Sequence, residues 1–341
     1  MAKRIITVLL ALLGALLAVA LVYVAYVMVT YERLPDNLAL TVDAPLAADE
    51  AAPVVSADEE FTVVTANLGF GYNRDFDFFM DGGRIGGRKP GGGARGHSRL
   101  GRAIRALSPD FVLFQEVDAD GTRSTTSTVR ASAHPVPSDW SVFCQNYDSA
   151  FLAWPLYAPH GANRAGLATF SRLPVGDPVR KSLPISESFS KLLDLDRCYS
   201  IVRVPAGDAE LVLFNVHLSA YGADASIMAA QREKLYEDMT AERVAGNYVI
   251  AGGDYNHDMI GVSGEVYGNA AQAVESWRSP TTSMACRRAS RWPPRRSETG
   301  TAAFPDAATC RDAGRPYDAP TTAGSGHLHL LRQRGVLTAP P

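Results

Sequence analysis

The stretch Tyr248-Val-Ile-Ala-Gly-Gly-Asp254-Tyr255-Asn256 carries the most specific structural signal in this 341-residue chain. Its apolar, β-branched start is typical of a buried strand, and the Gly-Gly pair permits a tight backbone turn. Asp254 and Asn256 are two residues apart, a spacing that brings both side chains to the same side. The stretch therefore predicts a buried strand that presents a carboxylate and an amide at its end.

Three further segments repeat this plan of an apolar strand that runs into polar side chains. They are Phe61-Thr-Val-Val-Thr-Ala-Asn67, Phe111-Val-Leu-Phe-Gln-Glu116 and Leu211-Val-Leu-Phe-Asn-Val-His217. Taken alone, a Glu such as Glu116 is more often a surface residue, and a His such as His217 is more often a hydrogen-bonded core residue. The pattern gains weight because all four segments place polar groups where a strand ends.

In this order, the four segments resemble the motifs of the endonuclease/exonuclease/phosphatase superfamily, which includes deoxyribonuclease I. The segment from Arg164 to Pro174 is similar to another strand and turn of that superfamily. The resemblance covers roughly residues 60–260. It implies an α/β fold: a four-layer sandwich of two mixed β-sheets flanked by helices, with the strand ends converging on one site. A helix is expected over residues 225–245, between the third and fourth motifs.

The resemblance also implies hydrolysis of a phosphoester with Mg²⁺, for which Mn²⁺ can substitute. Glu116 is expected to be the principal metal ligand, with Asn67 beside it as a metal and substrate contact. Asp254 is expected to contact the metal and to orient or deprotonate the attacking water. Asn256 would hold a phosphate oxygen or the water shell of the metal. His217 would donate a hydrogen bond to a non-bridging phosphate oxygen and so stabilise the charge that builds up there.

Weaker candidates lie outside these motifs. His160 and Asn163 lie in a loop that can touch substrate phosphate, but a plain surface turn explains them equally well. Arg197 precedes a predicted strand and is a candidate for structuring the site. His257 and Asp258 directly follow the fourth motif and are either supporting groups or solvated loop residues.

The N-terminus predicts a membrane segment. Lys3 and Arg4 precede an uninterrupted apolar run from Ile5 to Val29, which is longer than the roughly 20 residues that a helix needs to cross the bilayer core. Acidic residues follow the run, so the positive-inside rule places the N-terminus in the cytoplasm and the rest outside. The alternative is a cleaved signal peptide, for which Ala18-Val19-Ala20 is a candidate cleavage motif.

The net charge bears on nucleic-acid binding, and the cysteine content bears on zinc sites and disulfides. The formal net charge of -3 argues mildly against a dedicated nucleic-acid binder, whose domains are usually basic. The four cysteines, at positions 144, 198, 286 and 310, have no zinc-site spacing. One or two disulfides in an oxidising compartment, or buried free thiols, both remain open.

The C-terminal part departs from the superfamily pattern. The Ser-Asp-His motif that normally closes the sequence is missing, and neither His327 nor His329 follows an Asp. Beyond Trp277, arginine is abundant while lysine and isoleucine are absent. A disturbed reading frame and a natural, poorly ordered tail are the two interpretations. The domains expected are an anchor over residues 1–30, a flexible acidic linker over 31–60, a catalytic domain over 61–277 and an atypical segment over 278–341.

The function expected is therefore a metal-dependent phosphoester hydrolase, most simply a phosphodiesterase, that acts outside the cytoplasm. Its partners would be the membrane and a phosphoester substrate, which would be a lipid headgroup, a nucleic acid or a small phosphodiester. No protein partner is evident. One alternative is a catalytically inactive surface binding module, which the missing Asp-His pair favours. The other is a secreted or anchored nuclease.

Overall fold

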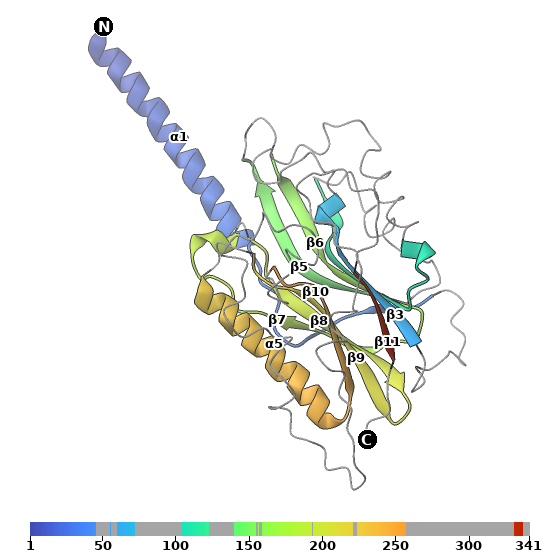
Figure 1. Ribbon diagram of the computed structural model, residues 1–341. Helices are drawn as coiled ribbons and strands as arrows, with labels where there is room; N and C mark the ends of the chain where they lie inside the picture. Colours follow the sequence, from blue (N-terminus) through green and yellow to red (C-terminus); the bar gives the residue numbers. More distant parts are fainter. Residues whose placement is uncertain are drawn as a thin grey trace, which may run out of the picture.

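A computed structural model of the chain describes residues 1–45, 55, 60–71, 104–122, 140–154, 156, 159–192, 194–220, 224–256 and 331–336. The described strands form two β-sheets packed against each other (Figure 1). The five-stranded sheet has the order β1-β7-β8-β9-β10, with bounds Leu38–Ala39, Gly176–Ser182, Cys198–Ala206, Ala209–His217 and Tyr248–Asp254. The six-stranded sheet has the order β11-β3-β4-β6-β5-β2, with bounds Leu331–Val336, Glu60–Asn67, Phe111–Gly121, Gly161–Ser171, Trp140–Leu152 and Val42–Asp43.

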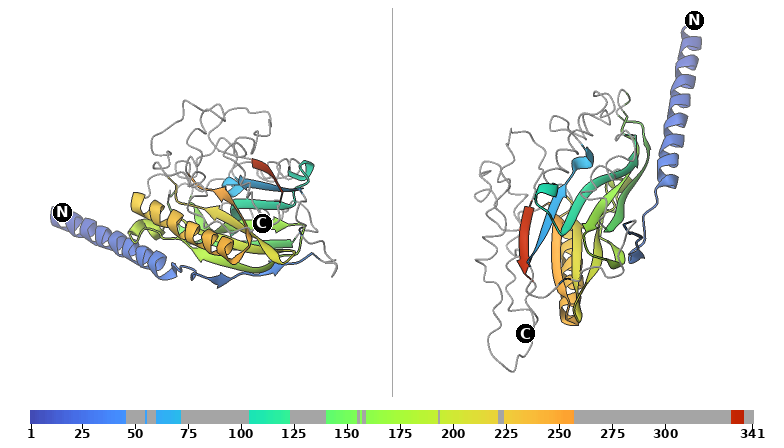
Figure 2. Two further views of the ribbon diagram at one scale, coloured as in Figure 1. Left: turned by 60° about the horizontal axis from the view of Figure 1, so that its bottom comes forward. Right: turned by 90° about the vertical axis from the view of Figure 1, so that its right-hand side faces the viewer.

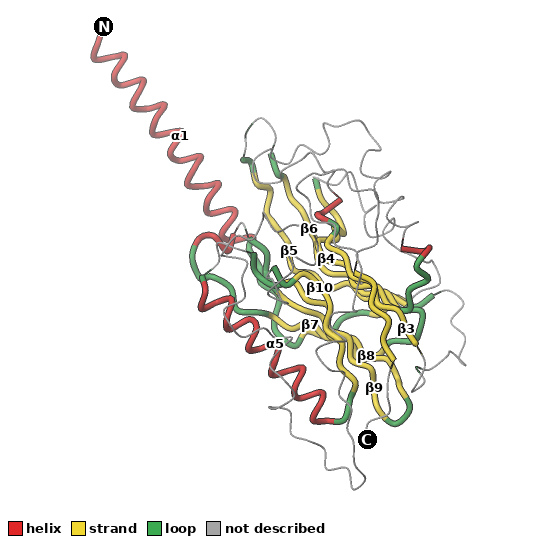
Figure 3. Tube along the Cα trace, in the orientation of Figure 1, coloured by secondary structure: helices red, strands yellow, loops and turns green. Residues whose placement is uncertain are grey.

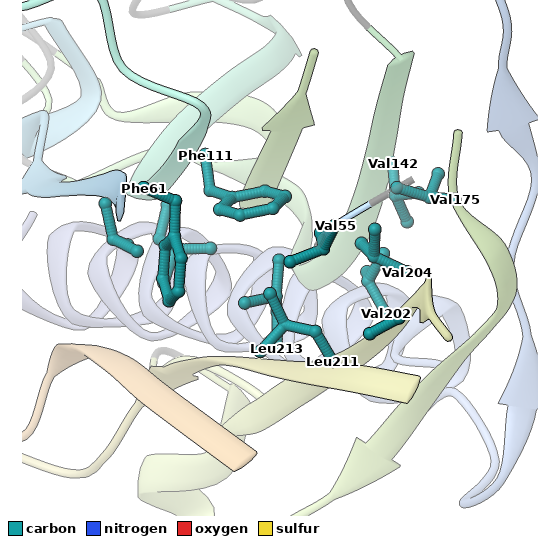
Figure 4. Packing of buried hydrophobic residues seen from close by; sticks show 12 residues of the cluster. Val55, Phe61, Phe111, Val142, Val175, Val202, Val204, Leu211 and Leu213 are labelled. Carbon is teal, nitrogen blue, oxygen red and sulfur yellow. The ribbon is translucent and has the colours of Figure 1, made fainter. Parts of the chain in front are cut away.

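Apolar side chains from both sheets form the central core. In β4, Phe111 and Leu113 face the core between the sheets, whereas Val112 and Phe114 belong to a cluster on the outer face. Because successive side chains of a strand point to opposite sides, a continuous apolar run fits a strand that is buried on both faces. Figure 4 shows the central cluster, in which Phe61 and Phe111 meet edge to face with ring centroids 5.9 Å apart.

Helical residues cover both outer faces. Helix α5, Ala225–Ala245, packs Leu235 against the outer side of the five-stranded sheet, and Figure 2 shows the helix lying along that sheet. The Asp224 carboxylate caps its N-terminus by accepting from Ser226 N, and Gly246 ends it with a φ of 100°. Ile104 and Leu107 pack on the outer side of the six-stranded sheet. The four-layer sandwich and the helix over residues 225–245 are both confirmed.

Helix α1, Ala2–Thr30, projects away from the sheets, as the trace in Figure 3 shows. It is long and apolar enough to cross a membrane, with a mean hydropathy of 3.0 over its most apolar window. The next residues differ from the expected flexible linker, because β1 pairs with β7 and β2 pairs with β5. Residues 31–45 thus pack on the domain; the two-residue strands were too short to leave a sequence pattern.

The atypical C-terminal segment contains one strand that the sequence did not predict. Strand β11 pairs antiparallel with β3, from Leu331 opposite Thr65 to Val336 opposite Glu60. Without it, β3 would be an edge strand of this sheet with unpaired backbone groups. The segment Leu331-Arg-Gln-Arg-Gly-Val336 lacks the alternation that marks a strand, so only its partner reveals it. Residues 257–330 and 337–341, which include His327 and His329, lie outside the described part of the chain.

Candidate active site

The carboxyl ends of β3, β9 and β10 lie at one edge of the sandwich together with Glu116. The sequence predicts a strand that ends at Glu116, but β4 continues to Gly121, so Glu116 lies inside this strand. Strands β3 and β4 are parallel, with Asn67 opposite Gln115, and β9 and β10 are parallel, with His217 opposite Asp254. Parallel strands present their carboxyl ends at the same edge, so the polar residues that close these strands are neighbours. The predicted gathering of the four motifs at one end of the sheets is therefore what the strand registers produce.

A side-chain hydrogen bond between the two sheets joins the first and fourth motifs. Asn67 Nδ2 donates to Asp254 Oδ2 at 2.7 Å, and Asn67 Oδ1 accepts from Gly69 N at 2.9 Å. The other carboxylate oxygen, Asp254 Oδ1, accepts from Asn256 N at 2.9 Å. Both side chains are thus held in place by backbone groups of the turns that follow their strands.

These hydrogen bonds keep Asp254 ionised. Burial would raise the pKa of the Asp254 carboxyl, but the neighbouring His217, the Asn67 amide and the Asn256 backbone N–H outweigh it, and the net pKa is below its ordinary value. The charge of Arg197 acts in the same direction. Asp254 is therefore a carboxylate at neutral pH, a form that can accept a proton from water.

Gly253 makes the approach of β10 to β9 possible. Its φ is 142°, and a Cβ at this position would lie 2.0 Å from Val216 O. A side chain is excluded both by the backbone conformation and by the neighbouring strand. Gly253 therefore lets β10 lie close enough to β9 to place Asp254 in the site.

Glu116 reaches the site through an irregularity in β4. The pairing of β4 with β6 shifts register between Phe114 and Val117, and Glu116 has a φ of 53°, which is uncommon for a residue with a side chain. The bulge directs the carboxylate toward the cluster, where Glu116 Oε1 lies 3.6 Å from His217 Nε2. Its side chain is 20% exposed, whereas that of His217 is 1% exposed. Glu116 is thus the more accessible of the two groups.

His217 is enclosed by two further polar side chains. Arg197 Nη1 lies 2.8 Å from His217 Nε2 and also donates to Leu218 O at 2.9 Å. On the other side of the ring, the Asn146 amide lies 3.5 Å from His217 Nδ1. All three side chains are buried. The sequence had suggested a structuring role for Arg197, but it gave no sign of Asn146, which stands in an ordinary strand pattern.

The arginine fixes the protonation of this histidine. A guanidinium only donates hydrogen bonds, so His217 Nε2 must accept, and the ring proton resides on Nδ1. The Nδ1–H then needs an acceptor, and Asn146 Oδ1 is buried without a partner among the described residues. Turning the Asn146 amide by half a turn pairs the two groups and satisfies both. Burial, followed by the Arg197 charge, lowers the pKa of His217 to about 3, so the ring is neutral.

This geometry alters the role expected for His217. Its Nε2 accepts from Arg197, so donation from Nε2 to a phosphate oxygen requires Arg197 to move and the proton to shift between the ring nitrogens. Arg197 places a cation beside the cluster, and within the described part of the chain its buried Nε has no hydrogen-bond partner. An anion could use this N–H only after a movement that opens the site, because the atom is buried.

A buried amide pair beneath the site fixes the two sheets relative to each other. Gln115 Nε2 donates to Asn215 Oδ1 at 2.7 Å across the sheets. Asn215 Nδ2 donates in turn to Phe114 O and Ala168 O, each at 3.1 Å. Asn215 is one of two polar residues in an otherwise apolar run, which is the signal in the sequence that could have identified it.

The structure places Asn163 inside β6, which begins directly after His160, so Asn163 is a strand residue and not the loop residue expected. Asn163 Nδ2 donates to His160 O at 2.9 Å, and Asn163 N donates to Ser149 Oγ at 3.1 Å. Asn163 pairs with Gly121, five residues beyond Glu116 along β4, or about 16 Å for an extended strand. The structure therefore does not bring His160 and Asn163 together with the cluster. His257 and Asp258 lie outside the described residues.

The oxygen-rich side of the cluster fits a hard divalent cation. Within the described part of the chain, no three His, Cys, Asp or Glu residues are grouped closely enough to form a metal site by themselves. The available donors are the Glu116 and Asp254 carboxylates and the Asn67 amide oxygen. Mg²⁺ typically binds one or two carboxylates, with an amide oxygen and water completing its ligands. Zinc instead typically binds nitrogen and sulfur donors.

Residues 64–310 match the family model described as Endonuclease/Exonuclease/phosphatase family. An endonuclease/exonuclease/phosphatase from Beutenbergia cavernae DSM 12333 shares 21% identity, with a TM-score of 0.39, and covers 58% of this chain and 48% of its own. ANGEL2, a 2',3'-cyclic phosphatase, shares 13%, with a TM-score of 0.40, and covers 67% and 59%. A family protein from Leptotrichia buccalis C-1013-b shares 13%, with a TM-score of 0.39, and covers 62% and 73%.

This chain thus spans 48% and 59% of the length of the first two structures. Scores this low carry no information on substrate or mechanism. No curated protein sequence matches the chain.

Proposed function

The chain belongs to the endonuclease/exonuclease/phosphatase family, and from this we propose that it is a Mg²⁺-dependent phosphodiesterase whose catalytic domain lies outside the cytoplasm. The family name itself denotes enzymes that hydrolyse phosphoester bonds. The observation that carries the proposal is the contact between Asn67 and Asp254, because it unites the two sheets at the edge where Glu116, His217 and Arg197 also lie.

The residues of this chain divide the chemistry among them. The Asp254 carboxylate, ionised and oriented by Asn67 and Asn256, is placed to align an attacking water and to accept its proton. Arg197 supplies positive charge for the phosphate oxygens, where negative charge builds up in the transition state. His217 keeps Arg197 in place through its unprotonated Nε2.

Glu116, with Asn67 and Asp254, would hold Mg²⁺, and Mn²⁺ has the same preference for oxygen ligands. Bound there, the cation would neutralise phosphate charge and favour departure of the leaving oxygen. The exposed fraction of Glu116 supports this role, because a metal that contacts substrate must be reached from solvent.

Contacts join the C-terminal part of α1 to the domain. Tyr23 Oη accepts from Ala153 N at 2.9 Å, and Tyr26 Oη accepts from Phe151 N at 3.3 Å. Val27 of the same helix is buried. The length of the apolar run supports the uncleaved anchor. Cleavage after Ala20 would leave Tyr23, Tyr26 and Val27 in place, so these contacts hold in either case. They also place the end of β5 beside the part of the helix where aromatic residues meet the membrane surface. A lipid headgroup is therefore the substrate class that the position of the domain favours.

The inactive binding module remains the rival, because the sequence lacks the Ser-Asp-His motif. The ordered cluster argues against it: buried, hydrogen-bonded polar groups such as Asp254 and Arg197 are costly to maintain without a role. A generic phosphodiester substrate and defined variants can separate the two proposals.

The test is hydrolysis of bis-p-nitrophenyl phosphate by the full chain in detergent, with Mg²⁺, with Mn²⁺ and with EDTA. We expect metal-dependent turnover that Glu116→Gln reduces by at least about 100-fold. Glu187→Gln is the matched control, since that carboxylate is 81% exposed and pairs only with Lys191 among the ion pairs of the described residues. Folded wild-type protein without turnover in any metal would favour the binding module.

A further inference from the structure

Two cysteine side chains from different sheets meet directly behind the cluster. Cys144 lies on β5 of the six-stranded sheet, and Cys198 opens β8 of the five-stranded sheet. Their Sγ atoms are 3.5 Å apart, and both side chains are fully buried. Both are thiols in this structure. Two sulfurs at this separation need only a small movement to form a covalent bond, provided that an oxidant accepts the electrons.

The surroundings favour the reactive form of one thiol. Leu167 and Leu40 pack around the pair, while the buried Arg180 lies nearby and donates from Nε to Gln145 O at 2.8 Å. Burial raises the pKa of the Cys144 thiol. For Cys198, burial is outweighed by the hydrogen bond with Cys144 and by the Arg180 charge, so its pKa lies below the ordinary value. The thiolate is the nucleophile in disulfide exchange, and in the folded chain Cys198 is the cysteine of the pair whose surroundings favour this form.

We propose that Cys144 and Cys198 form a disulfide that joins the two sheets when the chain folds outside the cytoplasm. The reaction needs a disulfide donor, such as a thiol oxidase protein or oxidised glutathione. While the chain folds and before the two side chains are buried, one cysteine thiolate attacks one donor sulfur and releases the other as a thiol. The second cysteine then attacks the protein sulfur of the mixed disulfide and releases the second donor thiol. The two cysteines lose two electrons and two protons, and the donor disulfide gains them. The inference rests on the proposed location of the domain.

The position of the bond connects it to the site. Cys198 follows Arg197 in the chain and pairs with His217 in the β8–β9 ladder, while Cys144 is two residues before Asn146. The disulfide would therefore tie together the two strands whose side chains flank the His217 ring. It would also close a loop of 54 residues, which restricts the unfolded chain.

The test uses the full chain extracted from membranes in detergent without reductant. Free thiols are alkylated under denaturing conditions, and the digested protein is analysed by mass spectrometry. We expect a cross-linked peptide containing Cys144 and Cys198, retained in the Cys286→Ala/Cys310→Ala control. Dithiothreitol should lower the Tm by roughly 5–10 °C, and it should leave the Tm of Cys144→Ala/Cys198→Ala unchanged.

A second experiment, a refolding arm, tests the pairing of the cysteines independently of where the protein resides in the cell. The purified, reduced chain is unfolded and refolded in a glutathione redox buffer. Alkylation of both cysteines in this arm, or pairing of either with Cys286 or Cys310, overturns the proposal. Pairing in this arm together with free thiols in the membrane-extracted protein overturns the disulfide in the cell, and with it the proposed location. Phosphodiesterase activity enters neither readout, so the enzyme proposal stands or fails separately.

Discussion

Asn67 and Asp254 are 187 positions apart in the sequence, yet Asn67 Nδ2 lies 2.7 Å from Asp254 Oδ2. Each residue closes a strand of a different sheet, so this hydrogen bond joins the two halves of the sandwich at the candidate active site. The bond also helps to keep the pKa of Asp254 below its ordinary value despite burial. Its removal should therefore affect both chemistry and stability.

Replacing Asn67 by Ala removes the donor and leaves a buried carboxylate with one partner fewer. We expect the free energy of unfolding to fall by about 1–3 kcal/mol and the turnover number to fall about 10–100-fold. Denaturant titrations and pH–rate profiles measure the two effects.

Asn67→Asp should place two carboxylates in contact and raise the pKa of Asp254, which moves the acid limb of the pH–rate profile to higher pH. An unchanged acid limb in Asn67→Asp would contradict the assignment of Asp254 as proton acceptor.

Gly253→Ala should be strongly destabilising. The new Cβ would lie 2.0 Å from Val216 O, at a φ of 142° that side chains rarely adopt. We expect a loss of at least about 3 kcal/mol in the free energy of unfolding. Gly176→Ala is the matched control, because a Cβ there meets nothing within 4 Å. Equal stability of the two variants in urea titrations would refute the close approach of β10 to β9.

The buried His217 should make the metal-free protein sensitive to acid. Its pKa is about 3 in the folded chain, chiefly because of burial, against an ordinary value of 6.5. Between these values the unfolded chain binds a proton that the folded chain does not, so stability falls as pH falls. We expect a slope of about 1.4 kcal/mol per pH unit below pH 6.5 from this residue. Urea titrations in EDTA at pH 7, 6 and 5 measure it.

His217→Gln supplies the comparison, because glutamine does not titrate and its amide oxygen can still accept from Arg197. The free-energy difference between wild type and variant should shrink as the pH falls. A difference that stays constant from pH 7 to pH 5 would show that His217 is protonated equally in the folded and unfolded chains.

An anchored domain should hold Trp154 at the membrane surface. Phe151, Trp154 and Leu156 are 43%, 73% and 78% exposed, and they adjoin the β5 residues that contact Tyr23 and Tyr26 of α1. In vesicles containing brominated lipid, we expect tryptophan fluorescence to be quenched, and the quenching to decrease in Trp154→Phe. Trp140→Phe is the control, since Trp140 is packed against the central core. Equal quenching in both variants would place the loop away from the bilayer.

Several features could be predicted from the sequence alone. Apolar runs that end in Asn67, Glu116, His217 and Asp254 specify buried strands through local periodicity. The helix expected over residues 225–245 is likewise present as α5. The uniformly apolar run near the N-terminus similarly identified a helix of membrane-spanning length, because length and composition suffice for that inference.

Other features depend on which strands become neighbours. The strand β11 is stabilised by β3 rather than by its own pattern, and Asn146 and Arg197 act on His217 only because β5, β8 and β9 meet. The same holds for Cys144 and Cys198, whose spacing in sequence says nothing about their 3.5 Å separation. Local sequence specifies the elements and the residues at their ends, because backbone propensity and side-chain alternation are local. Contacts, protonation and the environment of each group arise from the pairing and packing of distant segments, and these depend on the fold as a whole.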